Sequence, residues 1–341
     1  MNKSELNDLH YILIGLSAIL LTICLAEVIM LLVSKYRRKK QMEEEKEKLQ
    51  QEKEKQDALI NLSKLLPVKL FQELEINKLS EISMSPQKYI NSVVLEVNAA
   101  EFGKAVQRMQ AQEVFTYINH MLNEIVPIVC ENGGTIDKFD DAGFTAFFFE
   151  NYEKSLETAV SICEVKNKLT LLNQEYDKFS VGLCYGSVMV GVVGQKKRMS
   201  LLTVSEFTGL SIYLQSIAGK YYANILITGS YAELIDHFSE KFNSRFVGYI
   251  YMNITKSIEK IYDVFDGDPI ETRNRKRRTK ILFEKGVALF SQSNFEEARS
   301  HFIEVLKTDR FDRAAKEYLY LCDKYINQDI NQEKQIFIES Y

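Results

Sequence analysis

The chain has 341 residues and a formal net charge of −4, a length that allows two or three domains at roughly 100–200 residues each. Hydrophobic residues make up 46% and charged residues 26%, which excludes collagen-like, mucin-like and wholly disordered chains. The near-neutral charge argues against nucleic acid as a partner, and the five scattered cysteines exclude a disulfide framework and a cysteine-based zinc site.

An apolar segment at residues 11–34 predicts a transmembrane helix. The segment holds one ionisable side chain, Glu27, and exceeds the roughly 20 apolar residues that cross a bilayer as a helix. A cleaved signal peptide would end in a small-residue cleavage site, whereas five basic residues follow here, between positions 35 and 40. The positive-inside rule then leaves residues 1–10 outside the inner membrane and the bulk of the chain in the cytoplasm. Glu27 is either a functional intramembrane acid or a side chain that reaches the polar boundary.

Residues 35–85 predict a helical neck. Of the 26 residues from 35 to 60, 16 are charged, and opposite charges three or four positions apart support a solvated helix. Apolar residues at heptad-like spacing form a seam: Met42, Leu49, Leu59, Leu62 and Leu66. This seam favours a parallel coiled-coil dimer, and the alternative is a single helix that acts as a spacer. A second amphipathic helix at 61–80 is interrupted by Pro67.

Residues 86–266 predict an α/β domain. Apolar periodicity and turn residues predict, in chain order, a strand at 91–98, a helix at 108–130, a hairpin at 134–149, a helix at 153–173, two strands within 181–194, a helix at 204–218 and a strand at 223–228. This order is typical of a ferredoxin-like sandwich of the α/β (α+β) class.

Three motifs of this domain resemble those of class III adenylate/guanylate cyclases. They are GGTIDKF at 133–139, the glycine-rich run at 181–194, and the pair Arg198-Met199. The similarity extends from residue 62 to residue 265. The resemblance implies the sandwich fold of the class III nucleotidyl cyclases and sites that form at a dimer interface. It also implies a reaction in which two carboxylates hold two divalent ions beside a nucleoside triphosphate.

The resemblance also identifies the positions that carry the chemistry in such enzymes. The two metal-binding carboxylates fall on Asn98 and Ala142, and the purine-reading lysine falls on Lys138. The purine-reading partner, the ribose-orienting amide, the transition-state arginine and the phosphate-binding lysine fall, in this order, on Leu202, Gly209, Tyr213 and Asn253. An amide and a methyl group are poor ligands for magnesium or manganese. The sequence therefore predicts no catalytic residue, no bound metal and no cofactor, and leaves Lys138 as a weak purine contact.

Displaced ligands offer an alternative. Glu96 and Asp140 each lie two residues before a lost carboxylate, and alternate residues of a strand point to the same face. Together with Asp141 they could rebuild a Mg²⁺ or Mn²⁺ site. Under this alternative the protein is an active adenylate cyclase that converts ATP to cyclic AMP.

The C-terminal region predicts a separate helical tail. Residues 267–280 form a basic segment that is either a solvated linker or the start of a helix, with anionic lipid or nucleic acid as less favoured contacts. Residues 281–328 resemble a single tetratricopeptide repeat, with small and aromatic residues at Gly286, Phe295, Ala298 and Phe302. One repeat is too short to stand alone, so it docks on the cyclase-like domain or on a partner. Residues 329–341 predict a flexible C-terminus.

The sequence thus predicts a membrane-anchored, catalytically inactive relative of the cyclases. It would act as a dimerisation or regulatory module of intracellular signal transduction, as a homodimer or heterodimer through the neck and the cyclase-like domain. A second alternative is a membrane scaffold of a larger assembly, which recruits a protein partner through residues 281–328.

Overall fold

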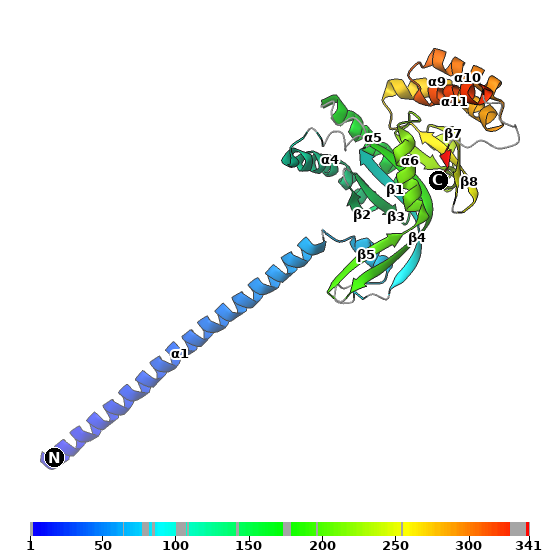
Figure 1. Ribbon diagram of the computed structural model, residues 1–341. Helices are drawn as coiled ribbons and strands as arrows, with labels where there is room; N and C mark the ends of the chain where they lie inside the picture. Colours follow the sequence, from blue (N-terminus) through cyan, green and yellow to red (C-terminus); the bar gives the residue numbers. More distant parts are fainter. Residues whose placement is uncertain are drawn as a thin grey trace. The chain divides into compact units, whose positions relative to one another are not determined.

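The computed structural model describes residues 3–63, 65–76, 82–83, 86–99, 107, 109–140, 143–172, 179–195, 197–253, 255–327 and 339–340. The chain divides into two compact units, Met1–Leu66 and Pro67–Tyr341. The second unit contains the helices and strands of the cyclase-like domain and of the tail (Figure 1).

The first unit is one continuous helix, α1 (Lys3–Ser63). Across the described residues, no helix is long and apolar enough to cross a membrane, and the structure does not support the span predicted at 11–34. The apolar neck residues Met42, Leu49 and Leu59 are exposed on α1. One strand of a coiled coil would expose its seam in this way, and the coiled-coil dimer stays a prediction.

The second unit is built on one sheet in which the described strands follow the order β2-β3-β1-β4-β6-β8-β7-β9, with β5 paired to β4. The strands are β1 (Gln87–Ala99), β2 (Thr135–Asp140), β3 (Gly143–Phe148), β4 (Phe179–Gln195), β5 (Arg198–Val204), β6 (Ile225–Thr228), β7 (Ser244–Met252), β8 (Ser257–Val264) and β9 (Glu339–Ser340). β1 is antiparallel to both of its neighbours, β3 and β4. The segment β2-β3-β1-β4 is the ferredoxin-like arrangement that the sequence predicts.

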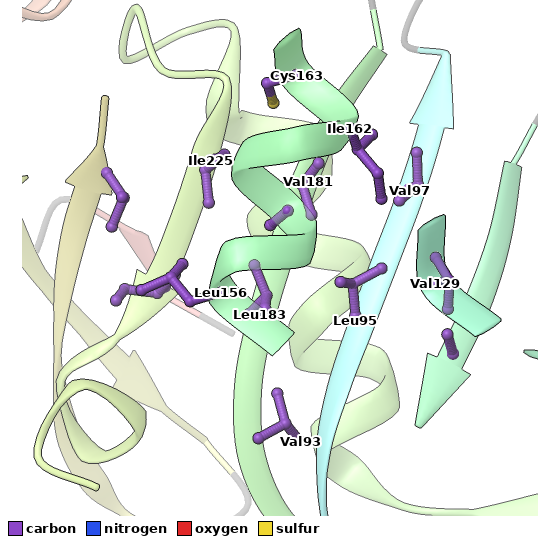
Figure 2. Close-up of a cluster of buried hydrophobic side chains, with 14 of the residues drawn as sticks. Val93, Leu95, Val97, Val129, Leu156, Ile162, Cys163, Val181, Leu183 and Ile225 are labelled. Atoms are coloured by element: carbon purple, nitrogen blue, oxygen red, sulfur yellow. The ribbon is translucent and has the colours of Figure 1, made fainter. Parts of the chain in front are cut away.

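Two helices cover one face of this sheet, α4 (Ala111–Glu131) and α5 (Tyr152–Leu172). Val93, Leu95 and Val97 of β1 are fully buried in the core that these helices share with the sheet, which also includes Val129 of α4 and Leu156 of α5 (Figure 2). Because side chains alternate along a strand, the even-numbered residues of this part of β1 point to the opposite face.

That opposite face carries α6 (Glu206–Ala218), whose first turn is capped by the Ser205 hydroxyl, which accepts a hydrogen bond from the backbone N–H of Phe207 at 3.1 Å. The helix lies directly on β4. A Cβ atom at Gly182 would lie 2.1 Å from the carbonyl oxygen of Ser211. Glycine at 182 therefore allows the close packing of α6 that shapes the floor of the candidate site.

The prediction of two strands within 181–194 is wrong. These residues belong to the single strand β4, and the hairpin partner is β5. The small residues that suggested a turn make room for neighbours instead, since a Cβ at Gly186 would lie 2.1 Å from the Phe207 ring. The chain turns after Gly194, which has a φ of +128°.

Three helices form the tail: α9 (Ile270–Ser291), α10 (Phe295–Thr308) and α11 (Arg313–Asn327). Of the two interpretations of the basic segment at 267–280, the structure matches the start of a helix, because from Ile270 onward this segment is the first half of α9; its Lys276 is fully buried. Gly286 of α9 faces the Phe302 ring of α10, with a built Cβ 2.9 Å from that ring. The small residue thus lets α9 and α10 pack closely, and the assignment as a tetratricopeptide repeat stays a prediction.

Shorter elements complete the unit: α2 (Val68–Glu73), α7 (Gly229–Ala232) and α8 (Phe238–Lys241). At the C-terminus, Glu339–Ser340 form β9 and pair in parallel with β7. These two residues of the predicted flexible segment at 329–341 thus extend the sheet.

Candidate functional site

The candidate site lies on the α6 face of the sheet, where β1 meets the β2–β3 hairpin. Glu96 of β1 is paired with Thr145 of β3, and the Thr145 hydroxyl donates a 2.7 Å hydrogen bond to Oε2 of Glu96. The Glu96 residue is 2% exposed. Burial raises the pKa of Glu96 to about 7; the Thr145 hydrogen bond lowers it, Asp140 raises it further and Lys138 opposes that rise. Glu96 is therefore a buried acid that changes its charge near neutral pH.

Asn98 lies two residues further along β1, on the same face. Its backbone carbonyl accepts a 3.0 Å hydrogen bond from the Gln215 side chain of α6, which also donates to the Ser180 hydroxyl at 3.0 Å. These bonds join the end of β1 to α6. The position that the family resemblance assigns to the first metal carboxylate is thus on the site face, and the residue there carries an uncharged amide. Ala142 and Asp141 lie outside the described residues.

The purine-reading positions lie where β5 approaches β2. The Thr203 hydroxyl of β5 donates a 2.7 Å hydrogen bond to Asp137 of β2. Burial raises the pKa of Asp137, and the Thr203 bond opposes that rise. The neighbours of this pair, Lys138 and Leu202, are both exposed. The fold therefore brings together the two strands expected to read a purine, with an ammonium group on one and an alkyl group on the other.

The remaining predicted positions are divided between α6 and the far side of the sheet. Gly209 and Tyr213 are half-buried, one helical turn apart on α6. Asn253 is exposed in the turn that follows β7, and β4, β6 and β8 separate β7 from β1 in the sheet order. One chain therefore does not bring Asn253 to Glu96.

A divalent ion fits the described donors poorly. Within the described ranges, no group of three or more His, Cys, Asp or Glu side chains lies close enough together to hold a metal ion. Of the displaced ligands, Glu96 is a buried acid with a raised pKa, and Asp140 is an exposed carboxylate at the end of β2. Hard cations prefer several oxygen ligands, and the described residues supply two carboxyl groups here, one of them buried.

The sequence reasoning missed three polar residues of this site: Thr145, Thr203 and Asp137. Each lies on a strand and forms a side-chain hydrogen bond to another strand. The sequence could have indicated them, because a charged or hydroxyl residue at a strand position that faces the protein interior is usually hydrogen-bonded.

No family model matches the chain. A curated relative, the terminal-differentiation-specific adenylate cyclase of Dictyostelium discoideum, is 22% identical over 265 residues, which cover 75% of this chain and 12% of that protein. An adenylate cyclase of Anabaena cylindrica is 21% identical over 192 residues, covering 51% of this chain and 36% of that protein. A solved structure of a bacterial light-regulated adenylyl cyclase superposes with a TM-score of 0.53 at 16% identity, over 65% of each chain.

The matched segments span about an eighth and about a third of the two curated relatives. The structural likeness concerns the fold, while the two curated relatives supply the likeness in sequence. The fold, the sequence likeness and the motifs at 133–139 and 181–194 agree with one another. The chain is therefore similar, in sequence and in fold, to class III adenylate/guanylate cyclases.

Proposed function

We propose that this protein is a non-catalytic cyclase homology module that acts in cyclic-nucleotide signalling as a dimerisation and regulatory unit. The observation that carries the proposal is Asn98 at the end of β1, on the site face and joined to α6 through its carbonyl. An amide at this position supplies no charge to a divalent cation. The nearest acid on the same strand face, Glu96, is buried and has a pKa of about 7.

The other substitutions act in the same direction. Leu202 is an exposed alkyl group on β5, and Gly209 and Tyr213 occupy the α6 positions expected for an amide and an arginine. Loss of one charge-stabilising group typically lowers a rate by about 10²–10³-fold. Losing the ions together with the arginine removes catalysis as a unit, because such effects do not add independently.

Exposed apolar side chains support association with a second copy of this domain. Val193, Leu202 and Val204 of the β4–β5 hairpin and Ile212 of α6 are all exposed in the single chain. Exposed apolar residues that gather on one hairpin and the helix beside it are typical of an interface. We place the dimer contact here and along the seam of α1, with a homodimer or a heterodimer as the two forms to separate.

The proposal is tested with the purified full-length chain, ATP or GTP, and Mn²⁺, with cyclic nucleotide measured by mass spectrometry. We expect no more product than a mock purification from cells with the empty vector gives. Product above that level, abolished by Asp140→Ala and retained in the matched control Asp236→Ala, would refute the proposal. Asp236 is an exposed carboxylate between α7 and α8 and lies outside the site.

The second candidate is an active adenylate cyclase with displaced ligands Glu96, Asp140 and Asp141. The observation in its favour is that Asp140 influences the pKa of Glu96, so the two carboxyl groups share one electrostatic environment. A bound cation would favour the ionised form of Glu96. The assay above separates the two candidates directly.

A scaffold role through the tail is a third possibility, and it depends on the outer surface of the three helices. The inner surface is occupied, since Tyr318 of α11 donates a hydrogen bond to the carbonyl of Val247 in β7. Ile281 and Tyr320 are exposed on the outer surface. A pull-down in which Ile281→Asp/Tyr320→Ser loses the partners of the wild type would support this role.

Cell fractionation tests the predicted location at the inner membrane separately.

A further inference from the structure

A cavity of about 840 Å³ lies between the cyclase-like domain and the tail. Its walls come from the second half of α5, the start of β4, the end of α6, the segment before β6, and helices α9 and α11. Six charged side chains line it: Lys166, Lys220, Arg313, Lys316, Asp268 and Glu317. The volume falls in the range of small-molecule sites, which is roughly 300–1,000 Å³.

The charges of this cavity do not cancel. Asp268 is 2.7 Å from the ammonium group of Lys276, outside the cavity wall, and Glu317 is 3.6 Å from Lys220. Both carboxylates are thus compensated. Arg313 and Lys316 are exposed side chains on α11 that form no ion pair with the described residues. A cavity with an excess of positive charge, in a chain whose net charge is −4, calls for an anionic occupant.

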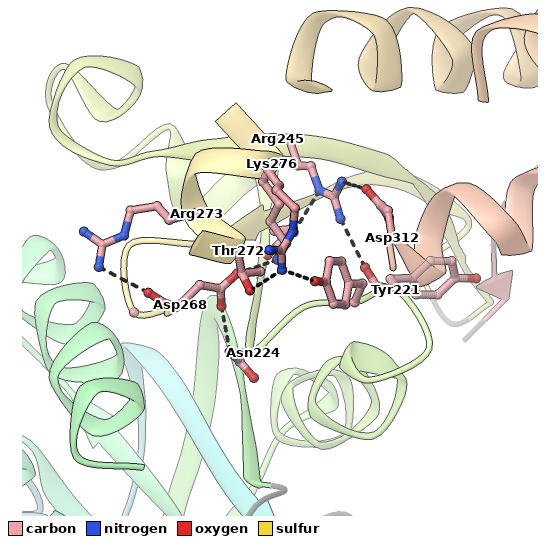
Figure 3. Close-up of polar contacts among 12 residues, drawn as sticks. Tyr221, Asn224, Arg245, Asp268, Thr272, Arg273, Lys276 and Asp312 are labelled. Carbon is pink, nitrogen blue, oxygen red and sulfur yellow. Dashed lines mark hydrogen bonds and ion pairs between the residues drawn. The ribbon is translucent and has the colours of Figure 1, made fainter. Parts of the chain in front are cut away.

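Lys166 provides a fixed cation on the opposite wall. The residue is 8% exposed, and its ammonium group donates a 2.7 Å hydrogen bond to Oδ1 of Asn224. The Asn224 amide in turn donates to Asp268 at 2.6 Å, as Figure 3 shows. Lys166 thus adds a buried ammonium group to the lining of the cavity.

The two walls are fastened to each other beside the cavity. Arg245 of β7 bonds Asp263 of β8 at 2.9 Å and Asp312, next to α11, at 2.6 Å (Figure 3). Lys276 of α9 bonds the same Asp263 at 2.9 Å. Burial opposes the charges of Arg245 and Lys276, but the facing carboxylates prevail and raise the pKa of both. The cavity is therefore preformed, and a ligand need not order it.

We propose that this cavity is a binding site for a small phosphate-bearing anion, a polyphosphate or a nucleotide. Phosphate oxygens are strong acceptors for the guanidinium of Arg313 and the ammonium groups of Lys316 and Lys166. Such a ligand would contact the cyclase-like domain and the tail at once. Glu96, Lys138 and Asp140 do not line this cavity, although Ser180 lines it and also accepts a hydrogen bond from Gln215 beside Asn98. The proposal does not depend on the proposed function.

Calorimetric titration of the full chain with inorganic pyrophosphate, and separately with ATP, tests the site. EDTA is present throughout, so metal-dependent binding at the family site does not contribute. Arg313→Ala/Lys316→Ala removes two exposed charges from the cavity wall. Arg278→Ala/Lys324→Ala is the matched control, because it removes two exposed charges of the same tail that do not line the cavity.

A second cavity variant keeps the test valid if the double variant misfolds. Gly219 lines the cavity, and a Cβ there would have no atom within 4 Å. Its φ of −63° suits any L-residue, so Gly219→Asp adds a carboxylate to the wall without a clash.

We expect saturable binding by the wild type and the control, and at least about tenfold weaker binding by both cavity variants, because charge-assisted hydrogen bonds are lost or opposed. Binding of pyrophosphate alone identifies a polyphosphate site, whereas tighter binding of ATP identifies a nucleotide site. Absence of binding by the wild type, or equal affinities across the four proteins, would overturn the proposal.

Discussion

Glu96→Gln gives the sharpest test of the candidate site. The substitution keeps the size of the side chain and an oxygen that can accept the bond from Thr145, and it removes the ionisable group. In the wild type, folding holds this carboxyl group in its neutral form at a pH where the unfolded chain ionises it. The variant has no such requirement, so the two proteins should differ in how their stability depends on pH.

The size of the effect follows from the pKa of Glu96, which rises from 4.5 to about 7 on folding. Each unit of pKa difference between the folded and the unfolded chain corresponds to about 1.36 kcal/mol. The group therefore changes the free energy of unfolding by about 3 kcal/mol. Because folding raises the pKa of Glu96, the contribution of this group to the stability of the wild type is fully present below pH 4.5. This contribution is lost as the pH rises through about 7. The residue is 2% exposed, so solvent screening removes little of this value.

Urea unfolding followed by tyrosine fluorescence measures the difference, since the chain contains 18 Tyr and no Trp. From pH 4.5 to pH 8, the stability of Glu96→Gln relative to the wild type should increase by about 3 kcal/mol. Glu131→Gln, at an exposed carboxylate that ends α4, is the matched control for the loss of one carboxyl group at the surface. A flat profile for Glu96→Gln would refute the description of Glu96 as a buried neutral acid.

The same experiment with Mn²⁺ separates the two candidate functions. If Glu96 were a metal ligand, the ion would favour its ionised form, and Mn²⁺ would stabilise the wild type at pH 7 but not Glu96→Gln. We expect Mn²⁺ to leave both proteins unchanged. Selective stabilisation of the wild type would support the active cyclase with displaced ligands.

Four further substitutions test the packing and the charges. Arg245→Met should destabilise the second unit by about 3–5 kcal/mol, because it removes the cation that pairs with the buried Asp312 and leaves Asp263 with Lys276. Urea unfolding measures this loss. Gly182→Ala should cost at least about 1–3 kcal/mol, since its Cβ would lie 2.1 Å from a carbonyl of α6; Gly219→Ala, in open space, should be neutral or stabilising in the same assay. Asp140→Asn should lower the pKa of Glu96, read as a shift of the pH-dependent stability step to lower pH.

The sequence predicts the order of helices and strands well because most of this fold depends on local patterns. Helix α4 ends at Asn132-Gly133, where Gly133 has a φ of +85°, and the β2–β3 hairpin follows at once. The strand alternation of β1 places Val93, Leu95 and Val97 on the helix-covered face. Turn chemistry and periodicity are properties of neighbouring residues, so one sequence is enough to read them.

The errors arise where the partner of a residue is distant in the chain. The small residues of β4 suggested a turn, whereas two of them make room for α6: Gly182 for Ser211 and Gly186 for Phe207. Thr203 and Asp137 are 66 residues apart and meet through one hydrogen bond. The sequence places the candidate positions on the right elements, but it does not show that Glu96 is buried, because burial is set by the packing of α6 and β3.

Charge shows the same dependence on distant partners, with opposite results at two positions. Lys276 belongs to a basic run that reads as solvated, yet it is fully buried because Asp263 and Asp268 lie 2.9 and 2.7 Å from its ammonium group. Glu96 is buried with a hydroxyl as its hydrogen-bonded partner, and burial raises its pKa to about 7. The difference between an ion held in place and an acid held neutral therefore lies in the group that the fold brings opposite. A buried lysine opposite two carboxylates fastens the tail to the sheet and keeps its charge, whereas burial beside a threonine hydroxyl raises the pKa of the glutamate.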